Sequence, residues 1–254
     1  MSGQTALAPA FFIAPDWPAP STVRALLTTR RGGVGKAPYE SFNLAAHVGD
    51  DPAAVAANRA ILRRHLPAEP LWLEQVHGVT VATAADSGNG ARARADASVA
   101  RARGEVCAIL TADCLPVLLC DDMGTVVAAA HAGWRGLAAG VLEAALARME
   151  TAPARIMAWM GPAIGPAAFE VGDEVRAAFL ETDTGAAAAF RAGEARGKWF
   201  ADLFMLARRR LTRAGVERVH GGGVCSFGAR EQFFSYRREG TTGRFASLIW
   251  LDKA

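Results

Sequence analysis

Three short apolar segments in the middle of the chain constrain its fold most. They are residues 106–110 (VCAIL), 115–120 (LPVLLC) and 126–130 (VVAAA). The runs are partly β-branched, and the turn residues 121–124 (DDMG) separate the second from the third, so the pattern predicts buried strands. Asp113 interrupts this apolar region far short of the roughly 18–20 residues that cross a membrane, so we expect no membrane span.

The remaining segments mix strand and helix patterns without a regular alternation of the two. Strand patterns occupy residues 23–29, 71–76, 79–83, 156–160 and 245–251, with a strand pair expected around His77 and Gly78. Helix patterns occupy residues 52–66, 136–150, 173–181 and 200–212, and loops or turns occupy 31–36, 86–94 and 221–223. The 254 residues show no internal repeat and no long linker. We therefore expect one α/β domain over residues 1–254, a mixed-sheet sandwich with helical layers, whose first roughly 20 residues form an arm.

The charge balance argues against a nucleic-acid partner. Lys and Arg total 28 against 25 Asp and Glu, which gives a formal net charge of +3. The densest basic run, residues 208–210 with Arg213, has no interleaved aromatic residue and follows the polar face of a predicted helix. We expect no nucleic acid as a partner, and the mild basic excess suits a small anionic substrate.

The N-terminus and the cysteines indicate the compartment. The first residues (MSGQTALAPAFFIAPDWPAP) hold no Lys or Arg before a short apolar patch, which is unlike a signal peptide. The four cysteines show no CxxC pairing, so we expect thiols or ligands rather than a disulfide framework, and a cytoplasmic location. Cys107 and Cys120 lie within apolar strands and are expected to be packing residues.

The strongest candidates for chemistry are His77, Cys114 and His131. Each lies at a turn or strand end beside small residues. Two imidazoles and a thiolate suit Zn²⁺, and three protein ligands leave a fourth position open, as in catalytic zinc sites. The spacing, with 36 and then 16 residues between them, matches no metal signature. Spacing therefore leaves two other interpretations open: packed core side chains, or a Cys114–His131 pair of nucleophile and base.

Six motifs carry a resemblance to a known family. In chain order they are 41–59 (SFNLAAHVGDDPAAVAANR), 73–78 (LEQVHG), 111–121 (TADCLPVLLCD), 130–136 (AHAGWRG), 161–175 (GPAIGPAAFEVGDEV) and 233–244 (FFSYRREGTTGR). Together they resemble the laccase-domain, or YfiH-like, family, long labelled multicopper polyphenol oxidases. Its members are regarded as zinc-dependent purine nucleoside phosphorylases that also deaminate adenosine and cleave methylthioadenosine. The resemblance runs from about residue 29 to residue 251, nearly the whole chain.

This resemblance implies a fold, a metal site and an activity. The fold is a compact α/β sandwich like that of cysteine hydrolases. His77, Cys114 and His131 become the ligands of Zn²⁺, with Cu²⁺ as an alternative occupant. The activity is phosphorolysis of adenosine, inosine, guanosine and methylthioadenosine together with adenosine deamination, so the partners are purine nucleosides and phosphate. Asp113 is expected to act in catalysis, by orienting a ligand or taking a proton. The protein is expected to be a monomer or a small homo-oligomer.

The resemblance also implies residues that bind the substrates. Arginine's planar guanidinium suits phosphate, and four arginines stand in the matched motifs: Arg59, Arg135, Arg237 and Arg244. Asn43 and His47 are expected to bind ribose hydroxyls or phosphate. Gln75 stands two residues before His77 and therefore on the same face of the predicted strand.

Two other functions stay open on the sequence. The older family label implies a copper-dependent polyphenol oxidase, but five histidines are too few for a type 1 copper and a trinuclear cluster. The Cys–His pair also resembles that of cysteine hydrolases, which implies action on peptide-like cell-wall precursors. Where the family often has a Gly-Pro-Cys-Ile motif, this chain has Ala163, and we expect this change to tune the site rather than remove it.

Overall fold

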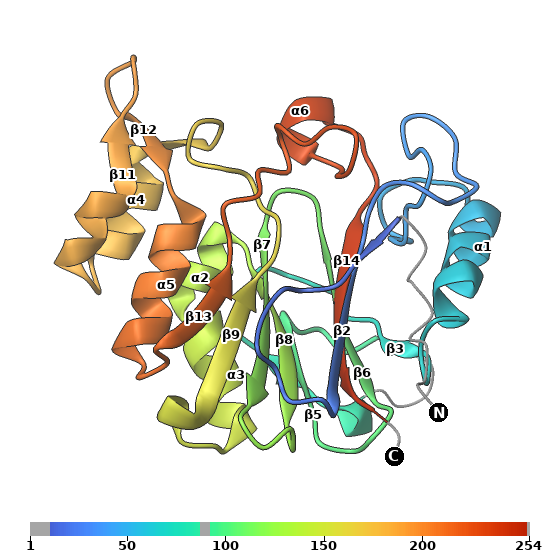
Figure 1. Ribbon diagram of the computed structural model, residues 1–254. Helices are drawn as coiled ribbons and strands as arrows, with labels where there is room; N and C mark the ends of the chain where they lie inside the picture. The colour runs from blue at the N-terminus through green and yellow to red at the C-terminus, as the bar shows by residue number, and fades with distance from the viewer. Residues whose placement is uncertain (1–10, 87–91, 253–254) are drawn as a thin grey trace.

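The computed structural model describes residues 11–86 and 92–252, in which two β-sheets lie face to face between helices (Figure 1). The five-stranded sheet has the order β1 (Phe12–Ile13), β2 (Val23–Thr28), β14 (Phe245–Leu251), β6 (Val106–Thr111) and β3 (Pro70–Leu71). The six-stranded sheet has the order β13 (Arg218–Gly221), β9 (Ile156–Met160), β7 (Leu115–Asp121), β8 (Val127–Ala132), β5 (Ala97–Ala100) and β4 (Val81–Ala82). The predicted α/β class with mixed strands is confirmed, although two stacked sheets stand where one was expected.

Helices cover the outer faces of the two sheets. Helix α1 (Pro52–Arg63) packs on the five-stranded sheet, where its Leu62 joins Leu26 and Leu248 in one apolar cluster. The six-stranded sheet packs against α2 (Trp134–Ala139) and α3 (Val141–Met149). Helix α5 (Leu203–Arg213) packs on both of these helices, and α4 (Asp173–Leu180) contacts α2. A third, small sheet contains β10 (Glu170–Gly172), β12 (Lys198–Ala201) and β11 (Phe190–Ala192). The short elements are α6 (Tyr236–Glu239) and three 3₁₀ turns, Ala84–Asp86, Pro153–Arg155 and Thr184–Ala189.

Strand β14 illustrates why strands in the middle of this fold, including the three central ones, are apolar along their whole length. Its Phe245, Ile249 and Leu251 pack between the two sheets, whereas Leu248 and Trp250 pack on the side of α1. Because both faces of such a strand are buried, the usual alternation of apolar and polar residues disappears. The three predicted central strands are confirmed as β6, β7 and β8, all of them fully buried. Strand β6 belongs to the five-stranded sheet, however, and the β7–β8 hairpin to the six-stranded one.

The predicted strand pair at residues 71–76 and 79–83 is wrong. Only Pro70–Leu71 (β3) and Val81–Ala82 (β4) are extended strands, and they belong to different sheets. The main-chain N–H groups of Val76, His77 and Gly78 donate to the carboxylate of Asp96 instead of to a neighbouring strand. A side chain therefore takes the hydrogen bonds that a hairpin would have used.

Three predicted helices have different bounds in the structure, and the one expected over residues 52–66 ends at Arg63. The segment 136–150 is divided into α2 and α3 at Gly140, whose φ of 103° glycine tolerates best. Helix α5 begins only at Leu203, because Phe200 belongs to β12 and Asp202 caps the helix by accepting from Met205 N. Asp51 caps α1 by accepting from Ala53 N.

Two further predictions fall partly outside the described residues. These are the loop at 86–94, of which 87–91 are not described, and the N-terminal arm, of which 1–10 are not described. The described chain begins at residue 11, and strand β1 pairs with β2 through Phe12 and Ile13. Within the described part of the chain, no helix has the length and apolar character that crossing a bilayer requires.

Candidate metal centre

The structure brings His77, Cys114 and His131 together at one end of the two central strands. His77 lies in the turn before β4, Cys114 immediately precedes β7, and His131 lies near the end of β8. One ligand atom from each residue lies within 4.8 Å of the others, and Cys114 Sγ is 3.8 Å from His77 Nε2. His131 is buried, Cys114 is half-buried and His77 is exposed, so the cluster faces solvent on one side.

Backbone strain marks the same place. His77 has a φ of 60° and Asp113, the residue before Cys114, has a φ of 94°. Residues other than glycine rarely adopt these left-handed conformations, which persist where the surrounding structure enforces them and are concentrated at functional sites. Among the described non-glycine residues, Glu150 is the one other with a positive φ.

A fully buried carboxylate that sequence reasoning missed stands behind the cluster. Asp96 Oδ1 lies 2.8 Å from His131 Nδ1 and accepts from His77 N at 2.9 Å. Its Oδ2 accepts from Gly78 N at 2.7 Å and from Val76 N at 3.1 Å. The local sequence signal for such a carboxylate is slight: an acidic residue directly before the short apolar segment 97–100.

The electrostatics favour a thiolate at Cys114. Burial raises the pKa of its thiol, but the charge of His131 and hydrogen bonds from His131 and His77 outweigh burial and lower the pKa to about 6. For His131, burial lowers the pKa, while the charge of Cys114 and the bond to Asp96 raise it to about 9. The thiolate is the form of cysteine that binds metals.

The three residues fit a metal ion. A Cβ atom at Gly133 would lie 3.0 Å from Cys114 Sγ and 3.4 Å from His131 Nε2, so the glycine keeps open the space that the ligand atoms face. Tetrahedral zinc with Zn–N near 2.1 Å and Zn–S near 2.3 Å separates nitrogen and sulfur by about 3.6 Å, close to the observed 3.8 Å. Two histidines and a cysteine also occur in copper sites, so the donor set does not choose between the two metals.

A cavity of about 440 Å³ opens beside the cluster and includes all three residues in its lining. One part of the wall is apolar or aromatic, formed by Trp134, Ile164, Phe169 and Tyr236. A larger cavity of about 610 Å³, near Trp72 and Cys107, contains none of the predicted site residues. We assign the chemistry to the smaller cavity, because the metal-ligating groups and the strained turns lie there.

Three of the predicted substrate-binding residues line this cavity with free cationic or imidazole groups. Arg244 uses Nη1 for the carbonyls of Thr242 and Gly243, and among the described residues its Nη2 and Nε have no hydrogen-bond partner and face the cavity as donors for a ligand. Arg135 lies over the Trp134 ring at 4.4 Å and is exposed. Partial desolvation, followed by the charges of Arg244, Arg92 and Arg59, lowers the pKa of His47, so this imidazole sits in a cationic environment.

The other predicted substrate-binding residues are engaged by the protein itself. Arg237 lines the cavity, but its guanidinium donates to the carbonyls of Ala168 and Glu170. Gln75 also lines the cavity, but both ends of its amide bond to the main chain of Leu110, and β3 ends at Leu71, so no strand places Gln75 on one face with His77 as predicted. Two residues lie outside the cavity lining: Asn43, which bonds to Asp50 and Arg244 N, and Arg59, which bonds to Leu44 O and lies 4.3 Å over Trp72.

Asp113 links Cys114 to the segment that covers the cavity. Its carboxylate accepts from Ser226 Oγ at 2.7 Å, from Ser235 Oγ at 3.0 Å and from Arg237 N at 2.7 Å. Ser235 is the N-cap of α6, so these bonds hold α6 and the cavity residue Tyr236 in place. With three donors on the carboxylate, the geometry fits the orienting part of the role predicted for Asp113 better than the proton-transfer part.

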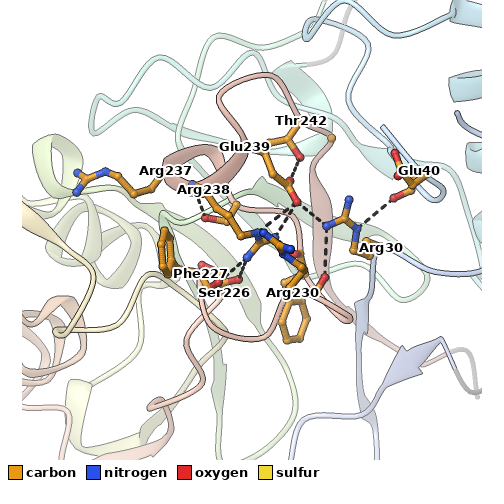
Figure 2. Close-up of polar contacts among 12 residues, drawn as sticks. Arg30, Glu40, Ser226, Phe227, Arg230, Arg237, Arg238, Glu239 and Thr242 are labelled. Carbon is orange, nitrogen blue, oxygen red and sulfur yellow. Dashed lines mark hydrogen bonds and ion pairs between the residues drawn. The ribbon is translucent and has the colours of Figure 1, made fainter. Parts of the chain in front are cut away.

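A second set of ion pairs anchors the far end of α6 (Figure 2). Glu239 accepts from Arg30 Nη1 at 2.6 Å and from Thr242 and Arg238. Arg238 in turn donates to the carbonyls of Ser226 and Phe227. Figure 2 shows Arg237 pointing away from this network. Arg30 follows β2, so the network ties the cavity cover to the five-stranded sheet.

Comparison with known proteins gives one consistent set of relatives. The family model described as "Multi-copper polyphenol oxidoreductase laccase" matches residues 24–252. A purine nucleoside phosphorylase of Pseudomonas aeruginosa is 55% identical over 241 residues, which cover 95% of this chain and 98% of that protein. The purine nucleoside phosphorylase YfiH of Escherichia coli is 53% identical, with 94% and 98% covered. A crystal structure from Neisseria meningitidis superposes with a TM-score of 0.91 at 51% identity and covers 96% of this chain and 100% of its own.

Proposed function

The chain belongs to the family described as multi-copper polyphenol oxidoreductase laccase, and we propose that it is a zinc-dependent purine nucleoside phosphorylase with adenosine deaminase activity. The proposed substrates are adenosine, inosine, guanosine and methylthioadenosine, together with phosphate. The relatives with 53–55% identity over nearly their whole length, which are named purine nucleoside phosphorylases, support the first activity. We also propose a cytoplasmic location and a monomer or small homo-oligomer.

One observation carries the proposal: the cavity beside His77, Cys114 and His131 combines a metal-ligating cluster, an arginine with free donors and an aromatic wall. A phosphorylase must hold an anion, a ribose and a flat apolar base in one pocket. A volume of about 440 Å³ is within the range of small-molecule sites. No other cluster of three metal-ligating side chains was found among the described residues.

Phosphate is assigned to the side of Arg244 and His47. A guanidinium with two unused donors suits a phosphate oxygen pair, and partial burial strengthens the attraction. In phosphorolysis a phosphate oxygen bonds to C1′ of the ribose, the C1′–N9 bond breaks, and its electron pair leaves with the purine, which takes up a proton. Arg244 and His47 hold the nucleophile for that displacement and screen its charge.

The purine is assigned to the wall formed by Trp134, Phe169 and Tyr236. Aromatic side chains offer a flat purine stacking and apolar contact, and the bonds of Asp113 hold α6 and Tyr236 over the pocket. When bound by His77, Cys114 and His131, zinc supplies Lewis-acid chemistry that activates water for hydrolytic deamination. These three residues hold the ion at the edge of the same pocket.

The proposal is tested by metal analysis of the purified protein followed by product chromatography. Adenosine, inosine, guanosine and methylthioadenosine are each incubated with and without phosphate. Zinc near one per chain, phosphate-dependent release of free base and formation of inosine from adenosine are the expected results. Zinc without phosphate-dependent turnover contradicts the phosphorylase, and base release without inosine contradicts the deaminase alone.

Two other activities are tested by further assays on the same purified protein. Copper in the purified protein, with phenol oxidation that is lost when the metal is removed and restored by reloading with zinc-free copper, favours the oxidase that the family description names. The cluster of two histidines and one cysteine supports binding of a single copper ion. Hydrolysis of peptide-like cell-wall precursors by the metal-free protein favours a cysteine hydrolase using Cys114 and His131.

A further inference from the structure

We propose that Asp96 is the positioning residue of the metal centre, because one buried carboxylate holds both histidine ligands. It binds the ring of His131 and the main chain of His77. This inference rests on the metal site of the proposed function and not on its substrates. Asp96 directly precedes β5, the strand that pairs with β8, and its main-chain oxygen also accepts from His131 N at 2.7 Å.

The bond to His131 selects one tautomer of its ring. Nδ1 lies 2.8 Å from Asp96 Oδ1, and an ionised carboxylate is an acceptor, so the ring proton stands on Nδ1. Nε2 faces Cys114 and the space in front of Gly133, so the neutral ring that binds a metal presents the lone pair of Nε2 there. Because Asp96 is fully buried and His131 nearly so, no water competes for this bond. A hydrogen-bonded carboxylate behind a histidine also makes the imidazole a more basic ligand.

The bonds to the turn place His77 through its main chain. Three consecutive N–H groups, those of Val76, His77 and Gly78, converge on the two oxygens of Asp96. This convergence requires the left-handed φ of 60° at His77, which is unfavourable for a histidine without such support. The side chain of His77 is exposed, so the anchored main chain is what fixes its position beside Cys114.

Asparagine is the informative substitution at this position. Four donors point at the carboxylate of Asp96, two at each oxygen. An asparagine of the same shape offers one acceptor oxygen and one NH₂ donor, so two of the four donors lose their acceptor and face another donor. Asp96→Asn therefore releases either the His131 side or the Val76–Gly78 side of the cluster without changing the volume of the side chain.

A matched control lies at the turn of the β7–β8 hairpin, away from the metal-ligating residues. Asp121 is also buried, and its carboxylate accepts from Thr125 N, Thr125 Oγ1 and Val126 N. It ends strand β7, whereas Cys114 precedes that strand, so the two positions are separated by roughly 23 Å of extended chain. Asp121→Asn removes comparable hydrogen bonds from a turn that contains no candidate ligand.

The experiment compares metal affinity in the wild type, Asp96→Asn and Asp121→Asn. The dissociation constant for Zn²⁺ is measured by competition with a chromophoric chelator, and Co²⁺ spectra report the coordination geometry without any substrate. We expect Asp96→Asn to bind zinc roughly 10–100-fold more weakly, with altered Co²⁺ bands, and Asp121→Asn to bind within about threefold of the wild type. Unchanged affinity in Asp96→Asn, or equal weakening in both variants, overturns the inference.

Two further results separate this inference from the proposed function. A wild type that binds no metal overturns both, whereas a wild type and an Asp96→Asn that bind zinc equally overturn the role of Asp96 alone. If Asp96→Asn does not fold, ¹⁵N spectra of the histidine rings in the zinc-loaded wild type give the answer. A proton on Nδ1 of His131 and zinc at Nε2 support the assignment, and zinc at Nδ1 overturns it.

Discussion

Cys114 Sγ lies 3.8 Å from His77 Nε2, although the two residues are 37 positions apart in the sequence. Because a thiolate is the one anionic donor of the cluster, Cys114→Ala removes the strongest attraction for a divalent cation. We expect this variant to lose both bound metal and phosphorolysis. Metal content by elemental analysis and turnover with inosine and phosphate check the prediction.

Cys107→Ala is the control for the loss of a thiol. Cys107 lies in β6 between the two sheets, where burial raises the pKa of its thiol to about 12. We expect this variant to keep its metal and its turnover and to lose about 1 kcal/mol of unfolding free energy through the small cavity created. Turnover retained in Cys114→Ala, or metal lost in Cys107→Ala, contradicts the assignment of the ligand.

Gly133→Ala is expected to weaken metal binding without removing any ligand. Its Cβ would lie 3.0 Å from both Cys114 Sγ and His77 Cδ2, so the ligands must move to accept it. Gly78→Ala is the matched control, because its Cβ meets Asp96 Oδ2 at an ordinary 3.5 Å. We expect at least a tenfold rise in the zinc dissociation constant for the first variant and less than a threefold change for the second. Similar values for the two would show that the space before Gly133 is not where the metal binds.

The two arginines Arg244 and Arg59 are expected to behave differently. Arg244 lines the cavity with two free nitrogen donors, whereas Arg59 stacks on Trp72 outside it. Removing a charged donor from an anion site costs about 2–3 kcal/mol, so Arg244→Ala should raise the KM for phosphate roughly 30–150-fold. Arg59→Ala should lower the free energy of unfolding and leave that KM unchanged. Steady-state kinetics at varied phosphate concentration measure the KM of both variants. A raised phosphate KM in Arg59→Ala alone would show that phosphate binds beside Arg59 and not beside Arg244.

The sequence predicts those parts of this fold that leave a pattern in neighbouring residues, and not those that depend on contacts between distant segments. The apolar runs that become β6, β7 and β8 are visible because burial on both faces leaves a local mark. Their division between two sheets is not visible, because β6 pairs with β14 from the end of the chain and not with β7. The break of one expected helix at Gly140 depends likewise on a left-handed residue within an apolar helical pattern.

The sequence likewise predicted part of the candidate site: the three metal-ligating residues, but not the carboxylate behind them. Residue type and position at turns or strand ends offered His77, Cys114 and His131 as candidates, and the resemblance to a family gave them a common role, which their proximity supports. Asp96 left no pattern, because its bonds go to main-chain N–H groups that any residue carries. The strand predicted to put Gln75 and His77 on one face was wrong for a related reason: the amide of Gln75 bonds to the main chain of Leu110, a contact that an extended strand at residues 71–76 does not contain.

The binding of anions should depend on the protonation of His47. The pKa of His47 is lowered by partial desolvation and by Arg244, Arg92 and Arg59, so a bound dianion raises it back and proton uptake accompanies binding. Sulfate keeps its charge between pH 5.5 and pH 8, and we expect it to bind roughly three- to tenfold more tightly at the lower pH. His47→Gln should remove this dependence. Titration calorimetry measures the sulfate affinity of the wild type and of His47→Gln at each pH. If both affinities change with pH in the same way, the proton is taken up by a group other than His47.

The pairing of Glu239 with Arg30 predicts a change of stability in acid (Figure 2). Burial raises the pKa of Glu239, but hydrogen bonds from Thr242, Arg30 and Arg238 outweigh it and lower the pKa to about 2, below the ordinary 4.5. The stabilisation by the ionised form is therefore complete above about pH 4.5 and is lost as the pH falls through about 2, and after solvent screening it amounts to about 1–2 kcal/mol. Glu239→Gln should be less stable than the wild type by that amount at pH 6, with the difference falling by roughly half by pH 3. Urea unfolding of both metal-free proteins across this range measures the difference, and a difference that stays constant with pH would mean that the Glu239 charge does not anchor α6.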